Sequence, residues 1–245
     1  MNKVGEYTYV TEAYSLDFRG RVMIPTLGNY LLHAATRHAT GRGFGYSDMN
    51  QKQTTWVLSR LALQMEGYPL LDEPIRIYTW IDEVSRLFTE RCFEITASDG
   101  KTLGYARSIW AAIDTESRRA APLDETALKE YLTDRPCPIA RPGKIRPVEG
   151  ETEGVVYRVK YSDLDVNGHL NSIKYMEHIL DLFDLETFRT KEISRFEIAY
   201  QAEGRYGMDL SLHLKELQEN QYDAAICNEG KSICRASIIW RPSVS

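Results

Sequence analysis

The chain has 245 residues, of which 43% are hydrophobic and 27% charged, a composition typical of a globular protein with a sizeable core. No run approaches the roughly 18 apolar residues that a membrane span needs. The first residues, MNKVGEYTYV, show no apolar signal core and no transit leader. The net charge is −5, without the concentrated basic patch of a nucleic-acid-binding protein. We therefore expect a cytoplasmic protein that binds neither nucleic acid nor membrane.

The cysteines favour free thiols, because the four of them are scattered and form no CxxC pair. Cys227 and Cys234 flank the turn NEGK, but a two-residue Glu-Gly loop would pair Cys227 with Ser232. No cysteine stands beside a histidine at metal-ligand spacing, and His33 and His38 are not spaced to share one helix face. The sequence thus predicts no metal and no cofactor.

In chain order, the first half begins with an apolar-periodic helix at residues 25–39, PTLGNYLLHAATRHA. An alternating strand at 56–65 follows, and further strands are expected at 74–84 and 87–98. This order of one long helix and then several strands predicts an α+β unit, whose helix must bury its apolar face on a curled antiparallel sheet.

The second half repeats this order. Its helix is expected at residues 171–183, NSIKYMEHILDLF, and its strands at 194–202, 208–217 and 222–227. Two hairpins also match without gaps: DGKTLGYARSIW at 99–110 and EGKSICRASIIW at 229–240. A chance repeat of one hairpin would not explain the shared element order, so we favour duplication.

Four prolines separate the halves and exclude a regular element between them. We therefore predict an N-terminal unit at residues 1–130, a proline-rich linker at 131–150 and a C-terminal unit at 151–245.

Polar residues cluster where the second long helix begins. In YSDLDVNGHLNS, Asp165, Asn167 and His169 alternate just before the helix, which Asn167 or Asn171 can cap. The unpaired N–H groups of a first helical turn can hold a developing oxyanion. A carboxylate, an amide, an imidazole and such N–H groups are what acyl-transfer chemistry requires. An ordinary Asp-x-Asn-Gly turn with a hydrogen-bonded histidine would give the same pattern.

Glu203 follows the alternating strand FEIAYQA in the second half. A carboxylate at the end of a core strand could face the cluster across the helix–sheet interface. A solvated glutamate at a strand end explains the position equally well, so both interpretations stay open at this stage.

The spacing Asp165, Asn167, His169, Asn171 and Tyr175 resembles that of acyl-acyl-carrier-protein thioesterases, the plant plastid enzymes and their bacterial relatives. The resemblance extends through WVLSRLALQMEGYP, IRIYTWIDE and SIWAAIDTESRR in the first half. It implies a tandem, or double, hotdog fold, in which a curved antiparallel sheet wraps each long helix. It also implies hydrolysis of fatty acyl-acyl carrier protein (acyl-ACP) in fatty acid biosynthesis.

The resemblance carries the family's catalytic residues onto Asp165, Asn167, His169 and Glu203. Plant members have a cysteine directly after that glutamate, whereas this chain has Gly204. A thiol nucleophile is therefore not expected here. Water or the Asp165 carboxylate must attack the thioester instead.

The first half has no Asp-x-Asn-x-His pattern, so we expect it to supply the acyl pocket. Candidate pocket walls are Tyr30, Leu31, Phe44 and Trp56, each of which could equally be plain core. The implied partner is acyl carrier protein, and the sequence leaves a homodimer open. The alternatives are an acyl-coenzyme A thioesterase, a hotdog dehydratase and a non-catalytic acyl-binding hotdog protein.

Overall fold

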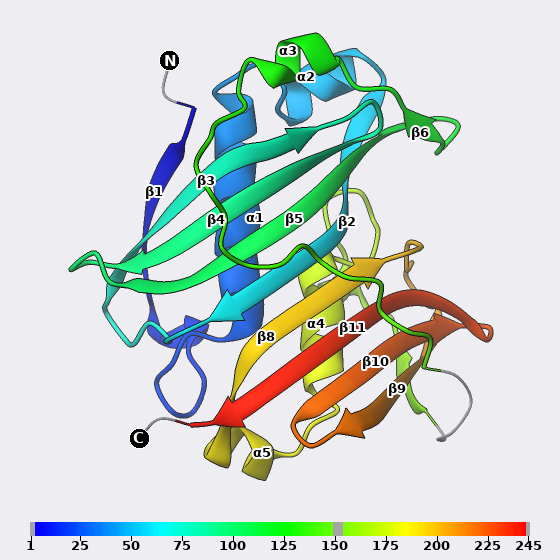
Figure 1. Cartoon of the computed structure of the whole chain (residues 1–245). Helices are drawn as coiled ribbons and strands as arrows, with labels where there is room; N and C mark the ends of the chain where they lie inside the picture. Colours follow the sequence, from blue (N-terminus) through cyan, green and yellow to red (C-terminus); the bar gives the residue numbers. More distant parts are fainter. Residues whose placement is uncertain (1–2, 149–153, 244–245) are drawn as a thin grey trace. The chain divides into compact units, whose positions relative to one another are not determined.

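The computed structural model describes residues 3–148 and 154–243. The chain divides into two compact units, residues 1–141 and 142–245, which are described here one at a time. Each unit is a long helix against an antiparallel sheet (Figure 1), which confirms the predicted α+β hotdog architecture. In the described ranges, no helix is long and apolar enough to span a membrane.

Unit 1 has a sheet in the order β1-β3-β4-β5-β2, with every pair antiparallel and β6 added to β5. Its elements are β1 (Gly5–Val10), a 3-10 turn (Ala13–Ser15), α1 (Ile24–Thr40), α2 (Tyr46–Gln51), β2 (Thr54–Met65), β3 (Pro74–Val84), β4 (Phe88–Ala97), β5 (Thr102–Asp114), β6 (Ala120–Ala121) and α3 (Glu125–Lys129).

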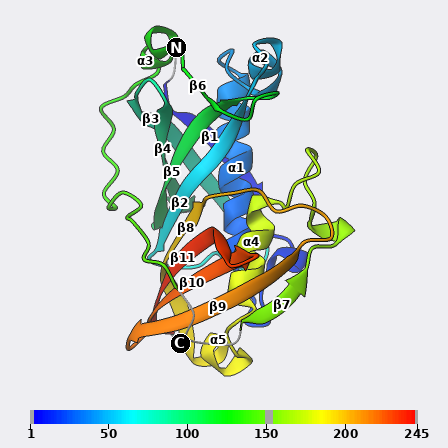
Figure 2. The same cartoon turned by 90° about the vertical axis from the view of Figure 1, so that its right-hand side faces the viewer.

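Unit 2 has a sheet in the order β7-β9-β10-β11-β8, again antiparallel throughout, with β7 beside β9 at one edge (Figure 2). Its elements are β7 (Val155–Arg158), a 3-10 turn (Tyr161–Asp163), α4 (Ser172–Leu180), α5 (Leu185–Thr190), β8 (Lys191–Tyr200), β9 (Asp209–Gln218), β10 (Gln221–Asn228) and β11 (Lys231–Pro242). Taken in sequence, its five strands occupy the same places as β1 to β5 of unit 1.

The long helices form where the apolar period predicts them. A proline in the first turn starts α1, because its missing N–H would have no partner there in any case. The buried face of α1 includes Leu27, Leu31 and Ala34, each 0% exposed, and this face packs on the sheet. In unit 2 the Asn171 side chain caps α4 by accepting a 2.9 Å hydrogen bond from the Ile173 N–H, so Asn171 rather than Asn167 is the cap.

The strands that pair with the two duplicated hairpins, β2 and β8, share an irregularity. Ser59 is an extra residue in β2, opposite Ile109 and Trp110, and Ser194 is an extra residue in β8, opposite Ile239 and Trp240. Such bulges bend and twist a strand, which lets the sheet curl around its helix. Because the same bulge faces the same Ile-Trp pair twice, the repeat extends from sequence to local geometry.

The turn of the second hairpin forms as predicted. Glu229 and Gly230 both have positive φ, 48° and 74°, the backbone that a two-residue type I′ turn requires. Cys227 therefore pairs with Ser232, and all four cysteines are free.

The start of the predicted linker lies along unit 1, where it covers the face of the sheet opposite α1 (Figure 1). Arg135 forms an ion pair with Glu94 and stacks 4.8 Å above the Trp80 ring. Residues 131–148 contain neither a helix nor a strand, while 149 and 150 lie outside the described residues.

Candidate active site

The loop before α4 is built around the Asp165 carboxylate. Its Oδ1 atom accepts hydrogen bonds from the N–H groups of Asn167, at 2.8 Å, and His169, at 3.0 Å. The Asp165 N–H donates back to the His169 carbonyl at 2.8 Å, and Gly168 takes the positive φ of 75° that closes the loop. Asn167 lies exposed at its tip. Asp165 therefore fixes the backbone that carries both Asn167 and His169.

A second segment meets this loop just after β8. The Leu170 N–H donates to the Gly204 carbonyl at 2.8 Å, and His169 forms a bridge with Arg205. These contacts bring His169 Nε2 to 3.2 Å from Glu203 Oε2. The two side chains are 21% and 33% exposed, so they are held by protein yet open to an incoming substrate.

The first turn of α4 keeps one donor for a ligand. Asn171 takes up two of its N–H groups: its side chain accepts from Ile173 and its carbonyl accepts from Lys174. Within residues 3–148 and 154–243, the Ser172 N–H has no hydrogen-bond acceptor. The candidate oxyanion donors are therefore the Ser172 N–H and the side-chain amide of the exposed Asn167.

Unit 1 contains the same backbone loop, although it has no Asp-x-Asn-x-His pattern. Asp17 Oδ1 accepts from the N–H groups of Arg19, at 2.9 Å, and Arg21, at 3.0 Å. The Asp17 N–H donates to the Arg21 carbonyl at 2.8 Å, and Gly20 has a φ of 73°. The corresponding segments are LDFRGRV and LDVNGHL, which share only their leucine, aspartate and glycine, too short a match to stand out in the sequence.

The chemistry differs although the loop is kept. Arg21 takes the place of His169 and binds Asp17 through Nε, at 3.1 Å, and Nη2, at 2.8 Å. The Val22 N–H donates to the Pro69 carbonyl as the Leu170 N–H does to Gly204, so Tyr68 takes the place of Glu203. Its ring lies 5.5 Å from the Arg21 guanidinium. Unit 1 therefore has no imidazole–carboxylate pair at this position.

The position after Glu203, where plant members have a cysteine, is occupied by Gly204 in unit 2. A Cβ on Gly204 would lie 2.9 Å from Leu170 Cβ and 3.1 Å from Tyr175 Oη, so the backbone is packed for a glycine. Cys234 is fully buried, and burial raises the pKa of its thiol well above the ordinary value. A protonated, enclosed thiol is a poor nucleophile.

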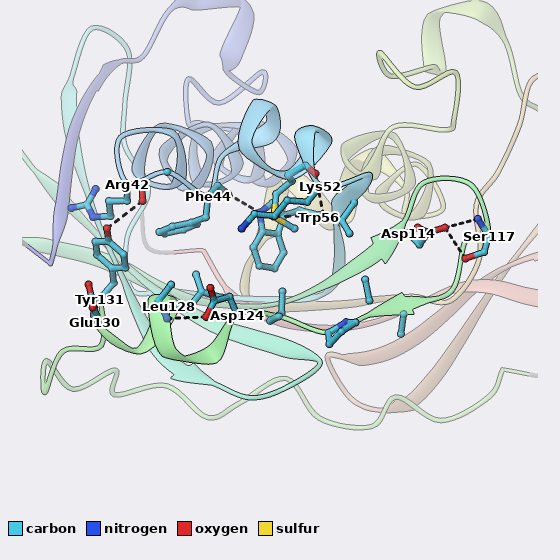
Figure 3. A pocket seen from close by; sticks show the side chains of 18 residues that line it. Arg42, Phe44, Lys52, Trp56, Asp114, Ser117, Asp124, Leu128, Glu130 and Tyr131 are labelled. Atoms are coloured by element: carbon cyan, nitrogen blue, oxygen red, sulfur yellow. Dashed lines mark hydrogen bonds between the residues drawn. The ribbon is translucent and has the colours of Figure 1, made fainter.

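Unit 1 holds a pocket of about 630 Å³ between α2, β6 and α3 (Figure 3). Phe44 and Trp56 line it, with Met49, Leu123 and Leu128. The Trp56 Nε1–H donates to the Phe44 carbonyl at 2.8 Å, which fixes the two rings as neighbouring walls.

Two of the four predicted pocket residues lie elsewhere. Tyr30 and Leu31 are not among the lining residues of this pocket. Leu31 is fully buried in the core, and Tyr30 stacks on Tyr9 with ring centroids 4.7 Å apart.

The described geometry defines a duplicated hotdog protein whose unit 2 carries a partly exposed imidazole–carboxylate pair, His169 and Glu203, beside the loop before α4. Family models agree with this: the acyl-ACP thioesterase N-terminal domain matches residues 2–131, and the C-terminal domain matches residues 148–242. The chain belongs to the acyl-ACP thioesterase family.

Among solved structures, an acyl-ACP thioesterase from Bacteroides thetaiotaomicron is 43% identical and superposes with a TM-score of 0.93 over 98% of each chain. A 12:0-ACP thioesterase from Umbellularia californica shares the fold, with a TM-score of 0.88 over 99% of each chain at 21% identity. A curated relative, the chloroplastic palmitoyl-acyl carrier protein thioesterase of Gossypium hirsutum, is 25% identical over 94% of this chain. The chain spans 62% of the length of that relative.

Proposed function

We propose that this protein hydrolyses fatty acyl-ACP thioesters to free fatty acid and acyl carrier protein, and so ends fatty acid synthesis. Family membership and the activities named for its relatives support this proposal. The observation that carries it is the 3.2 Å contact between His169 Nε2 and Glu203 Oε2, at a loop that also presents Asn167. An imidazole supported by a carboxylate is a general base for thioester hydrolysis.

In this proposal the thioester carbonyl lies over the start of α4. The Ser172 N–H and the Asn167 amide hold the oxygen as negative charge develops on it. Losing one such donor typically costs about 3–4 kcal/mol of transition-state stabilisation. His169 then takes a proton from the attacking water while Glu203 stabilises the imidazolium that forms, a role worth roughly 10²–10⁴ in rate. The C–S bond breaks as the tetrahedral intermediate collapses, and the imidazolium returns its proton to the departing thiolate of the carrier protein.

Asp165 could also attack directly and form a mixed anhydride. The loop of unit 1 argues for a different role, because Asp17 makes the same backbone hydrogen bonds where neither histidine nor glutamate is present. A carboxylate that is present in unit 1 without the catalytic pair has a structural role, which is to hold the loop backbone. We therefore assign the attack to water and assign to Asp165 the positioning of Asn167 and His169.

The unit 1 pocket is our candidate for the acyl chain. Its volume lies in the range of small-molecule sites, and its walls are mostly apolar, as an alkyl chain requires. Arg42, Lys52 and three carboxylates lie among its lining residues, so charged groups are present as well.

Acyl carrier protein is the proposed partner, and a homodimer remains an open expectation. Arg118, Arg119, Lys144 and Arg146 are candidate contacts for an acidic carrier. A cytoplasmic location fits the four free cysteines, since reducing compartments keep thiols unpaired.

The direct test is free-thiol release from acyl carrier protein loaded with chains of graded length. Thiol release from the same acyl chains on coenzyme A is measured in parallel, and the Glu203→Ala variant is the control for release that does not depend on the site. We expect turnover on the carrier-protein substrate to exceed that on coenzyme A and to fall by roughly 10²–10⁴ in the variant. Faster turnover of coenzyme A substrates would reassign the leaving group, and water elimination from a β-hydroxyacyl chain without thiol release would indicate a dehydratase. Binding of acyl chains without thiol release or elimination would indicate a non-catalytic protein.

A further inference from the structure

Tyr175 contacts the backbone on both sides of Glu203. It projects from α4 and is 2% exposed. Its Oη accepts a hydrogen bond from the Gly204 N–H at 2.7 Å and donates one to the Ala202 carbonyl at 3.3 Å. A phenol has one hydrogen to give and lone pairs to accept with, so the two bonds use both of its capacities.

The phenol keeps the hydrogen that it donates to the Ala202 carbonyl. Burial raises the pKa of Tyr175 well above its usual value, so the hydroxyl remains protonated. A buried donor or acceptor left without a partner is costly, and the backbone at Ala202 and Gly204 therefore stays where the hydroxyl meets it. Glu203 lies between these two points, so its Cα is held from both neighbours.

Unit 1 provides an internal comparison. Leu27 follows Asp17 by the same number of residues as Tyr175 follows Asp165. The residue in the place of Gly204 is Pro69, which has no N–H to satisfy. Unit 1 therefore lacks both partners of the hydrogen bond: Leu27 replaces the Tyr175 phenol, and Pro69 replaces the Gly204 N–H. The hydroxyl occurs in the unit that carries the His–Glu pair.

We propose that Tyr175 is a positioning residue for the hydrolysis, which holds the Glu203 backbone so that the carboxylate meets His169 Nε2. The proposal rests on the catalytic role assigned above to His169 and Glu203. In this role Tyr175 touches neither the substrate nor the reacting atoms. It affects the rate of the chemical step and not the binding of substrate. A displaced catalytic group loses rate steeply, since a misplacement of about 1 Å can cost 10²-fold.

The test is the kinetics of Tyr175→Phe on acyl-ACP. We expect kcat to fall about tenfold with KM within about twofold, because only the catalytic carboxylate is loosened. Tyr222→Phe is the matched control, since it removes a phenol hydrogen bond to Glu216 within the same unit, away from the loop. We expect the control to keep kcat within about twofold.

A double-mutant cycle separates positioning from plain stability. Adding Tyr175→Phe to Glu203→Ala should leave the residual rate unchanged, because there is no longer a carboxylate to hold. A further tenfold loss would show a general structural role and overturn the proposal. Tyr175→Phe with wild-type kcat would also overturn it, whereas Glu203→Ala with wild-type kcat would overturn the proposed function itself.

The wild-type protein offers a measurement that does not depend on the variant folding. The Gly204 amide, which donates to Tyr175, should exchange its hydrogen much more slowly than the amides of the exposed neighbours Arg205 and Tyr206. Exchange of the Gly204 amide at the rate of those neighbours would contradict a stable hydrogen bond to Tyr175.

Discussion

His169 Nε2 lies 3.2 Å from Glu203 Oε2, although His169 belongs to the loop before α4 and Glu203 follows β8. Two backbone contacts bring these side chains together. The Leu170 N–H donates to the Gly204 carbonyl, and His169 forms an antiparallel β-bridge with Arg205. Unit 1 keeps the same backbone arrangement with Arg21 and Tyr68 in these places. The loop frame is therefore shared, and the side chains alone give unit 2 its acid–base pair.

Replacing the loop carboxylate should separate the two units by their effect on catalysis. Asp165→Ala leaves the Asn167 and His169 N–H groups without their acceptor, so we expect kcat/KM to fall by at least about 10²-fold. Asp17→Ala makes the matched change in unit 1 and removes an ion pair with Arg21. It should lower the free energy of unfolding by about 1–2 kcal/mol and leave kcat within about twofold. Steady-state kinetics and urea unfolding measure both effects, and equal kinetic losses in the two variants would contradict the assignment.

The route of attack is open to isotope labelling. With water as the nucleophile, a single turnover in ¹⁸O-water should label the fatty acid and leave the Asp165 carboxylate unlabelled. Mass spectrometry of the peptide containing Asp165 makes this measurement. Label in that peptide would identify Asp165 as the attacking group.

Changing the pocket walls should change the acyl preference. Phe44→Trp adds volume to a wall of the 630 Å³ pocket, so we expect the preferred chain to become shorter. Tyr46→Ala is the control, because Tyr46 is 52% exposed on α2 and does not line the pocket. Competition among acyl-ACP substrates of graded length gives the profile, and an unchanged profile for Phe44→Trp would place the acyl chain elsewhere.

Acid should weaken unit 1 through His38. Arg91 Nη1 lies 3.0 Å from His38 Nδ1, and since a guanidinium only donates, Nδ1 accepts while Nε2–H donates to the Lys3 carbonyl at 3.1 Å. Burial and the Arg91 charge lower the pKa of His38 from 6.5 to about 3. The unfolded chain therefore binds this proton first, and the stability present above pH 6.5 is lost as the pH falls toward 3, by up to about 1.4 kcal/mol per pH unit.

His38→Gln removes this titration. The stability difference between the wild type and the variant should shrink on acidification, as measured by urea unfolding from about pH 7 to pH 4. His33→Gln, the same substitution on the exposed face of the same helix, is measured beside it. A constant difference for His38→Gln would contradict the buried neutral imidazole.

Much of the fold could be predicted because local patterns specify it. The apolar period predicted α1 and α4, alternation predicted β3 at its observed bounds, and the Glu-Gly pair predicted the pairing of Cys227 with Ser232. The strands β1 and β7 were missed, since edge strands such as GEYTYV are short and half exposed. Helix α4 is also shorter than expected and ends at Leu180, because Asp181 and the following residues turn toward α5.

The site shows the same division. Asp165, Asn167 and His169 lie close in sequence, so their loop could be recognised, but the approach of Glu203 depends on hydrogen bonds between distant segments. The roles of Tyr175 and of the Asp17 loop depend on comparing two copies of one frame. The correspondence of Pro69 with Gly204, and so of Tyr68 with Glu203, follows from backbone hydrogen bonds that the sequence does not show.

The central claim is that His169 and Glu203 act as one unit, and the cycle of His169→Ala, Glu203→Ala and the double variant tests it most directly. Each single variant should lower kcat on acyl-ACP by roughly 10²–10⁴, and the double variant should be no slower than the slower single one. Losses that multiply, or a single variant that keeps more than about half of the wild-type rate, would show that the two residues do not share one catalytic step.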